Sequence, residues 1–163
     1  SDDVIISTSA GQAVRFSEKD ARPMGRNARG VRGIRLRPHD QVVGMDIADE
    51  NRSLLVLSSN GYGKLTKTSN FSSHKRGGVG IKSAVVTAKT GTIISVRSID
   101  PDAKEILIIS SQGQTIRVGL ADIPQLGRTT QGVRIMRLAD QDSVASLGII
   151  FDQKEEEEEE TKS

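Results

Sequence analysis

Short apolar runs rich in Val, Ile and Leu alternate along the chain with turns of glycine and small polar residues. Three segments share one pattern, in which an apolar run, a glycine-containing turn and a second strand-forming run follow one another: residues 4–16, 54–66 and 106–118. β-Branched residues favour strands, and glycine adopts the positive φ that tight hairpin turns need. The pattern therefore predicts three β-hairpins.

The hairpins recur at a nearly constant spacing. Their turn glycines are Gly11, Gly61 and Gly113, which lie 50 and 52 residues apart. A second series, the Gly-Val steps that begin at residues 30, 78 and 132, has spacings of 48 and 54 residues. Since both series keep the same period, we interpret the chain as three copies of one unit.

Each copy has room for two further strands. We predict a third strand after each Gly-Val step, at residues 33–36, 80–86 and 133–138. A polar turn then leads to a fourth, at residues 42–47, 92–99 and 144–151. Four strands in about 50 residues are typical of blades arranged radially. The predicted fold is all-β, a propeller-like array of about three four-stranded antiparallel blades, at residues 1–50, 51–101 and 102–151.

Composition excludes several classes of protein. The chain of 163 residues has no cysteine, so it contains neither a disulfide nor a thiolate zinc site. It has no run of about 18 apolar residues that would span a membrane, and it does not start with the basic-then-apolar pattern of a secretory signal. We expect a soluble, cytoplasmic β-protein.

Charge divides the chain into a basic body and an acidic tail. The net charge is +2, but residues 152–163 contain seven acids and two lysines, a net of −5, which leaves +7 on residues 1–151. This asymmetry is typical of a nucleic-acid binder with a charged appendage. We predict that the tail is disordered. Its role is either solubility alone or, as a sharper hypothesis, competition with a bound nucleic acid for the basic surface.

Much of the positive charge of the body lies in three acid-free stretches, here called the basic segments: residues 22–37, 75–82 and 127–138. Arginine binds phosphate oxygens bidentately, and glycine beside it lets the backbone approach the phosphate. Aromatic residues, at 2%, are too few to stack on single-stranded bases, so the segments favour the backbone of duplex DNA, bound without regard to sequence. The candidate phosphate contacts are Arg22, Arg26, Arg29, Arg32, Arg35, Arg37, Lys64, Lys75, Arg76, Lys82, Arg117, Arg128, Arg134 and Arg137.

Two other interpretations stay open. Any one arginine is as well explained by an ordinary solvated surface, although three acid-free segments at the same place in a repeat argue against this for the set. Alternatively, the array is a protein-interaction propeller whose basic rim binds an acidic protein. In each binding interpretation, repetition would place the segments along one rim.

No reaction chemistry is predicted. Tyr62, the only tyrosine, occupies the repeat position of Gln12 and Gln114, so it is a hairpin-turn residue rather than a nucleophile. His39 and His74 have no second ligand at metal spacing. We therefore predict no catalytic residue, no metal site and no cofactor.

Several stretches resemble the C-terminal domain of the DNA gyrase A subunit, in the same order: residues 13–16, 22–25, 30–36, 60–64 and 127–133. The resemblance implies a β-pinwheel, a disc of about six blades with strand exchange between neighbours, whose positive perimeter bends and wraps DNA. It also implies that the domain supports negative supercoiling together with the rest of its own subunit and with the gyrase B subunit, which hydrolyses ATP. The catalytic tyrosine would then belong to a different domain.

The resemblance is to part of that domain. The three repeats resemble its last three blades, followed by the acidic tail often found in the family. The family's Gln-Arg-Arg-Gly-Gly-Lys-Gly box is absent, and residues 74–80 keep only Arg76-Gly77-Gly78 and Gly80 of it. The matching domain of topoisomerase IV, which is specialised for decatenation, is an alternative, and open blade edges predict self-association.

Overall fold

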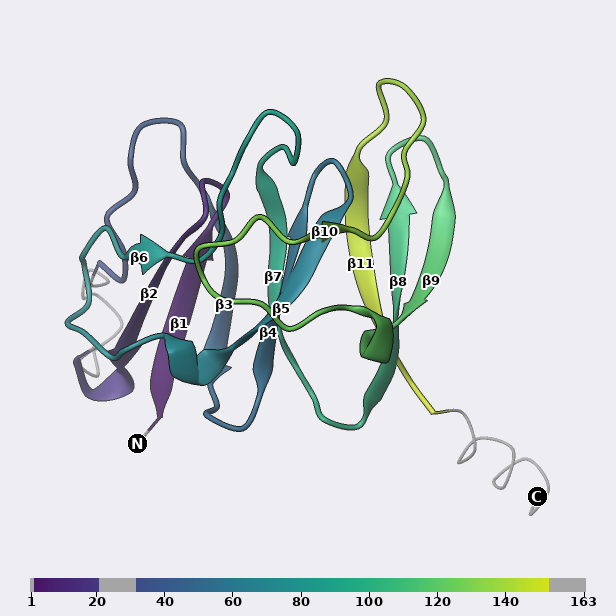
Figure 1. Ribbon diagram of the computed structural model, residues 1–163. Coiled ribbons are helices and arrows are strands. Elements are labelled where there is room, and N and C mark those ends of the chain that lie inside the picture. Colours follow the sequence, from purple (N-terminus) through teal and green to yellow (C-terminus); the bar gives the residue numbers. More distant parts are fainter. Residues whose placement is uncertain (1, 21–31, 153–163) are drawn as a thin grey trace, which may run out of the picture.

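The computed structural model describes residues 2–20 and 32–152, which form three antiparallel sheets standing side by side (Figure 1). Each sheet is built around one predicted hairpin, and all three hairpins are confirmed. They are β1 (Asp3–Thr8) with β2 (Gln12–Ser17), β4 (Ser53–Ser58) with β5 (Tyr62–Lys67), and β8 (Ala103–Ser110) with β9 (Thr115–Gly119). A short 3-10 helix follows each hairpin: η1 (Glu18–Asp20), η2 (Thr68–Asn70) and η3 (Leu120–Asp122). No helix in these residues is long and apolar enough to cross a membrane.

The predicted fourth strand of each repeat is also confirmed. The three strands are β3 (Val42–Ala48), β7 (Ile93–Ile99) and β11 (Val144–Phe151). Each pairs antiparallel with the first strand of its own repeat, so that β3 joins β1, β7 joins β4 and β11 joins β8. These strands form one edge of every sheet.

The third strand differs from the prediction in length and in place. Within residues 32–41 the structure has no strand, and the later copies shrink to two residues each, β6 (Ile81–Lys82) and β10 (Val133–Arg134). Each of these crosses to the sheet before it, since β6 pairs with β2 and β10 pairs with β5. The sheet orders are β3-β1-β2-β6, β10-β5-β4-β7 and β11-β8-β9. Neighbouring repeats therefore exchange a strand, as the family resemblance implies, and the third sheet has three described strands rather than four.

The hairpin turn explains why the exchanged strands are so short. Gly61 has a φ of +86°, and its carbonyl accepts hydrogen bonds from both Ile135 N and Met136 N, at 2.8 and 3.2 Å. The carbonyl of Gly11 accepts in the same way from Ser83 N and Ala84 N, at 2.8 and 3.4 Å. Two successive amides that share one acceptor cannot continue a ladder, because a ladder gives alternate amides separate partners. The chain leaves the sheet edge at that point.

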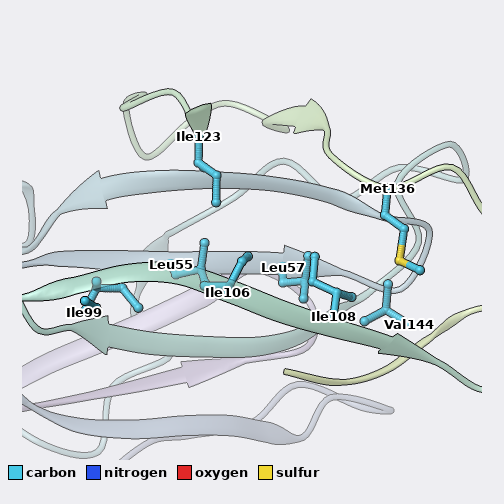
Figure 2. Close-up of a cluster of buried hydrophobic side chains, with 9 residues drawn as sticks. Leu55, Leu57, Ile99, Ile106, Ile108, Ile123, Met136 and Val144 are labelled. Carbon is cyan, nitrogen blue, oxygen red and sulfur yellow. The ribbon is translucent and has the colours of Figure 1, made fainter. Parts of the chain in front are cut away.

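Two apolar cores separate the three sheets. Strand β4 is buried on both faces, and because side chains alternate along a strand, Leu54 and Val56 face the first sheet while Leu55 and Leu57 face the third. Figure 2 shows the second of these cores, where Leu55 and Leu57 meet the β8 residues Ile106 and Ile108. The apolar runs of the sequence therefore supply the side chains that pack between neighbouring sheets.

The outer face of the first sheet is only partly covered by the described residues. Ile6, Val14 and Phe16 form a small third cluster there, and Met45 and Ile47 beside them are 69% and 61% exposed. The equivalent faces of the second and third sheets are each buried against the sheet before them. Met45 and Ile47 thus form an exposed apolar patch on the first sheet.

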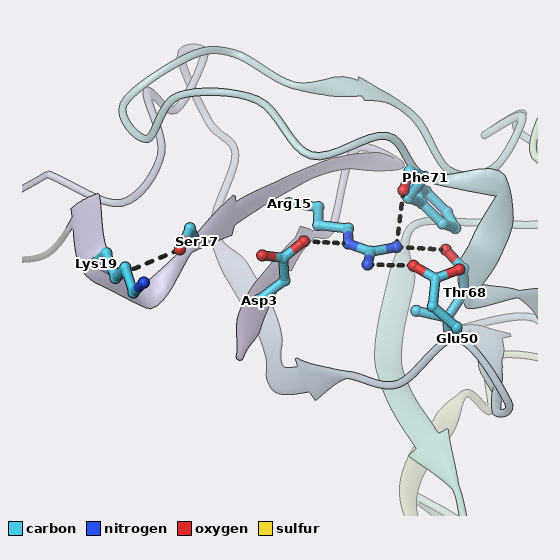
Figure 3. A network of polar contacts seen from close by, with 7 residues as sticks. All are labelled: Asp3, Arg15, Ser17, Lys19, Glu50, Thr68 and Phe71. Atoms are coloured by element: carbon cyan, nitrogen blue, oxygen red, sulfur yellow. Dashed lines mark hydrogen bonds and ion pairs between the residues drawn. The ribbon is translucent and has the colours of Figure 1, made fainter. Parts of the chain in front are cut away.

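A polar network joins the first sheet to the second (Figure 3). The half-buried Arg15 of β2 pairs with Asp3 at 2.8 Å and with Glu50. Its guanidinium also donates to the carbonyl oxygens of Thr68 and Phe71, at 3.4 and 3.0 Å. Because these groups come from both sheets, Arg15 fixes their relative position next to the second basic segment.

Candidate nucleic-acid interface

The described parts of the three basic segments lie next to one another along one side of the sheets. The first and second segments are joined by the amides of Gly77 and Arg35, which donate to the carbonyls of Gly33 and Gly78, both at 2.8 Å. The second and third are joined where Arg128 Nη1 donates to the Lys82 carbonyl at 2.9 Å. Since β6 and β10 form the outer edges of the first and second sheets, we call this side the basic edge.

Most of the predicted cations on the basic edge are accessible. The side chains of Arg32, Arg35, Arg37, Lys75, Lys82, Arg134 and Arg137 are exposed, and those of Arg76 and Arg128 are half-buried. In the part of the chain that the structure describes, ion pairs involve Arg15, Arg52 and Arg117 and none of these nine side chains. Their charges are therefore available to an anion.

Two arginines join neighbouring segments with part of their donor set. Arg76 donates from Nε to the Asp20 carbonyl at 2.8 Å and from Nη1 to the Arg32 carbonyl at 3.2 Å. Arg128 donates from Nη1 to the Lys82 carbonyl at 2.9 Å and lies 5.9 Å from the centre of the Phe71 ring. Because a guanidinium has five N–H donors, both retain donors for a phosphate.

Lys64 is a correction to the predicted contacts. This β5 side chain is 1% exposed, and its Nζ donates inward to the carbonyls of Gly127, Arg128 and Thr130, at 2.8, 3.2 and 3.0 Å, and to Thr130 Oγ1 at 3.2 Å. With its three N–H groups directed at these oxygens, the ammonium cannot reach a phosphate outside. The structure makes Lys64 part of the support of the third basic segment.

The buried position of Lys64 predicts an unusual titration. Burial, and then the positive charge of Arg128, lower the pKa of Lys64 from 10.5 to about 8. Between these two values the unfolded chain binds more protons than the folded one, so the free energy of unfolding should rise with pH in this window. Below pH 8 Lys64 is protonated in both the folded and the unfolded state, and its contribution to the free energy of unfolding is then smallest. We expect one lysine signal with a midpoint near pH 8 in an NMR titration, absent from Lys64→Met; a midpoint near 10.5 would contradict the burial.

Arg117 differs from the cations of the basic edge because it has a carboxylate partner. It lies on β9, but its Nε and Nη2 both bind Glu105 Oε2, at 2.9 and 2.6 Å. The carboxylate comes from the paired strand β8 of the same hairpin, at the repeat position that Asp3 occupies opposite Arg15. Arg117 is 59% exposed but, unlike the cations of the basic edge, it is paired with a carboxylate that a phosphate would have to displace. Arg22, Arg26 and Arg29 lie outside the described residues, as does the acidic tail from residue 153.

Lys89 belongs to the basic edge and was missed by sequence reasoning. Its Nζ lies 5.7 Å from the centre of the buried Tyr62 ring, and the Arg134 guanidinium lies 5.4 Å from the same centre. The side-chain amide of Asn60 holds the Lys89 turn by donating to the carbonyls of Ala88 and Lys89, at 3.3 and 3.1 Å. The sequence does show a lysine in the predicted polar turn at residues 89–91. Only the fold, however, brings this turn next to the hairpin turn that precedes Tyr62.

Tyr62 has a structural place that fits its predicted role as a turn residue. Its ring packs under the two cations, and its hydroxyl accepts a hydrogen bond from Arg134 Nη2 at 3.2 Å. Cation–π contact of this kind orients a cation while leaving its outer side free. Among residues 2–20 and 32–152, no cluster of three or more His, Asp or Glu side chains is arranged to hold a metal ion.

Comparison with known proteins matches this arrangement to one family. The sequence model described as DNA gyrase C-terminal domain, beta-propeller, matches residues 2–49, 52–100 and 104–150. The DNA gyrase A subunit of Staphylococcus aureus strain MRSA252 is 39% identical over 164 residues, which cover 99% of this chain and 18% of that protein. Its counterpart in strain NCTC 8325 is 40% identical over 158 residues, which cover 96% of this chain and 18% of that protein. The chain thus spans less than a fifth of the length of these relatives.

Solved structures agree on the fold. A structure of the DNA gyrase A C-terminal domain matches with a TM-score of 0.81 at 30% identity, covering 92% of this chain and 51% of that one. The C-terminal domain of DNA topoisomerase IV matches with a TM-score of 0.85 at 20% identity, covering 99% and 50%, which is a likeness in fold. With its repeats, exchanged strands and basic edge, the chain belongs to the family of DNA gyrase A C-terminal domains.

Proposed function

We propose that this chain binds duplex DNA along the basic edge, without regard to sequence, and bends it. The observation that supports this most strongly is the direct hydrogen bonding of the three basic segments to one another. It joins accessible cations from separate repeats into one surface, and in the described residues these cations have no carboxylate partner. A single cationic loop would not provide such an extended surface.

The chemistry of the edge suits the sugar–phosphate backbone. Arginine and lysine side chains neutralise phosphates and release condensed counterions, which supplies most of non-specific affinity. The edge crosses from the first sheet to the second, so a duplex must follow it to contact all three segments. A duplex that bends to follow the basic edge gains further contacts between its phosphates and the cations. Binding of this kind therefore favours bent DNA.

The same proposal extends to the longer protein. We infer that the chain is part of the A subunit of DNA gyrase, an ATP-dependent type II topoisomerase of the bacterial cytoplasm, and that it supports negative supercoiling with the gyrase B subunit. The catalytic residues would lie elsewhere in the longer protein, and this part would need no cofactor. The relatives at 39% and 40% identity favour gyrase over topoisomerase IV. A supercoiling assay on the intact holoenzyme separates these two, because topoisomerase IV is specialised for decatenation.

A salt series with labelled duplex DNA tests the binding function. We expect two duplexes of equal length and unrelated sequence to bind with equal affinity. The logarithm of the binding constant should fall linearly with the logarithm of the salt concentration, with a slope of about −0.9 for each phosphate contacted. Polyglutamate is the matched acidic competitor. Tight binding to polyglutamate with none to DNA would support the protein-interaction alternative instead.

Self-association is the remaining proposal for partners. The exposed apolar patch of Met45 and Ile47 on β3, the edge strand of the first sheet, is the surface that a second copy would cover. Sedimentation velocity over a range of protein concentrations measures self-association directly. A monomer at all concentrations would reject self-association and leave the DNA proposal untouched.

A further inference from the structure

The third basic segment has an internal support that phosphate contact alone does not explain. A lysine is among the residues least often buried, yet Lys64 is 1% exposed. Four oxygen atoms of the turn at residues 127–130 lie within 3.2 Å of its Nζ. Thr130 Oγ1 also donates to the Gly127 carbonyl at 2.8 Å, which closes the turn on itself. The turn is folded around a buried positive charge.

We propose that Lys64 is a positioning residue for DNA binding, which holds this turn so that the Arg128 side chain and the amides of Arg128 and Thr129 together form one phosphate subsite. The proposal rests on the DNA-binding function proposed above and names a part of the same surface. Lys64 itself touches no phosphate.

The direction of the amides follows from the planarity of the peptide bond. In a trans peptide the N–H points opposite to the carbonyl of the preceding residue. The carbonyls of Gly127 and Arg128 point inward to Lys64 Nζ, so the N–H groups of Arg128 and Thr129 point away from it. Within the described ranges of the chain, neither N–H has a hydrogen-bond acceptor. Successive outward amides in a turn form a concave anion-binding site.

The Arg128 guanidinium completes this subsite. Its bond to the Lys82 carbonyl and its contact with the Phe71 ring fix the side chain beside the second segment. The exposed Lys82 side chain lies on strand β6 of that segment. Because Lys64 and Arg128 repel each other, a phosphate placed outside the turn would relieve repulsion and gain charge-assisted bonds. The buried lysine therefore contributes a positive electrostatic potential at the subsite and also holds the conformation of the turn.

A double-mutant cycle tests the proposal. We expect Lys64→Met to weaken binding of the whole chain to a random duplex by about tenfold, and Arg128→Ala by a similar factor. The double variant should be little weaker than Lys64→Met alone, because the displaced turn no longer presents Arg128. Lys67→Met is the matched control, since Lys67 is an exposed lysine of the same strand as Lys64, and it should stay within about twofold of the wild type.

Chemical rescue separates positioning from stability. The chain has no cysteine, so Lys64→Cys can be aminoethylated while unfolded and then refolded to restore an ammonium at this single place. We expect the unmodified variant to bind weakly and the aminoethylated one to regain most of the affinity. Hydrogen exchange gives an independent readout: DNA should protect the Arg128 and Thr129 amides in the wild type and fail to do so in Lys64→Met.

The outcomes distinguish this proposal from the one on which it rests. If the wild type shows no salt-dependent binding of duplex DNA, the proposed function fails. If the wild type binds and folded Lys64→Met binds equally well, the positioning role is wrong. Additive effects of Lys64→Met and Arg128→Ala would also overturn it, as would a refolded aminoethylated variant that stays weak.

Discussion

Reversing three cations of the basic edge, with Lys82→Glu, Arg134→Glu and Arg137→Glu in one chain, should weaken duplex binding by about a thousandfold at moderate salt. Each substitution removes one phosphate contact and places a carboxylate beside the DNA backbone. The salt slope should become shallower by roughly three contacts, or about 2.7. Fluorescence anisotropy with two unrelated duplexes measures both quantities, and the loss should be equal for both sequences.

A second triple variant controls for net charge. Lys67→Glu, Arg97→Glu and Lys104→Glu change the charge by the same amount at exposed positions. Arg97 lies on β7, at the edge of the second sheet opposite β10, and Lys104 lies on the central strand β8. We expect a loss of less than about tenfold, since distant exposed charges are screened by salt. Equal losses in the two triples would show that overall charge, and not the basic edge, binds DNA.

The second large effect concerns the Gly61 turn, which receives an exchanged strand, compared with the Gly113 turn, which receives none in the described residues. Gly61 and Gly113 have nearly the same φ, +86° and +87°. A Cβ on Gly61 would lie 2.3 Å from the Met136 carbonyl oxygen, whereas a Cβ on Gly113 would meet nothing within 4 Å. Gly113→Ala should therefore cost only the strain of a left-handed alanine, about 1–2 kcal/mol. Gly61→Ala should cost about 3–4 kcal/mol, because it also disrupts the two hydrogen bonds to its carbonyl. Urea unfolding measures both free energies.

The Gly61→Ala and Gly113→Ala variants also test whether strand exchange supports DNA binding. Gly61→Ala displaces Met136 and hence β10, which carries Arg134, so the folded variant should bind DNA several-fold more weakly, in line with the loss of one or two contacts. Gly113→Ala leaves the basic edge in place and should bind as the wild type does. Equal stability of the two variants would mean that the exchanged strand adds little to the fold.

Much of the architecture could be predicted because its signals are local. The hairpin at residues 54–66 is encoded by an apolar run, a glycine that must take positive φ and a second run, all within a few residues. The fourth strands follow in the same way from their apolar content. The basic segments were visible for a similar reason, since arginine, glycine and the lack of acids are properties of a short stretch.

Contacts between residues far apart along the chain decided the rest. The sequence by itself determined three repeats, their hairpins and the chemical character of the basic segments, because each depends on neighbours along the chain. Only the tertiary structure decided that β6 and β10 cross to the preceding sheet and that Lys89 lies over Tyr62. It also turned Lys64 from an expected phosphate contact into a buried support, because the oxygens that surround it come from 63 to 66 residues further along the chain. The residue type gives the charge of a side chain, but its exposure to solvent depends on which distant backbone groups fold against it.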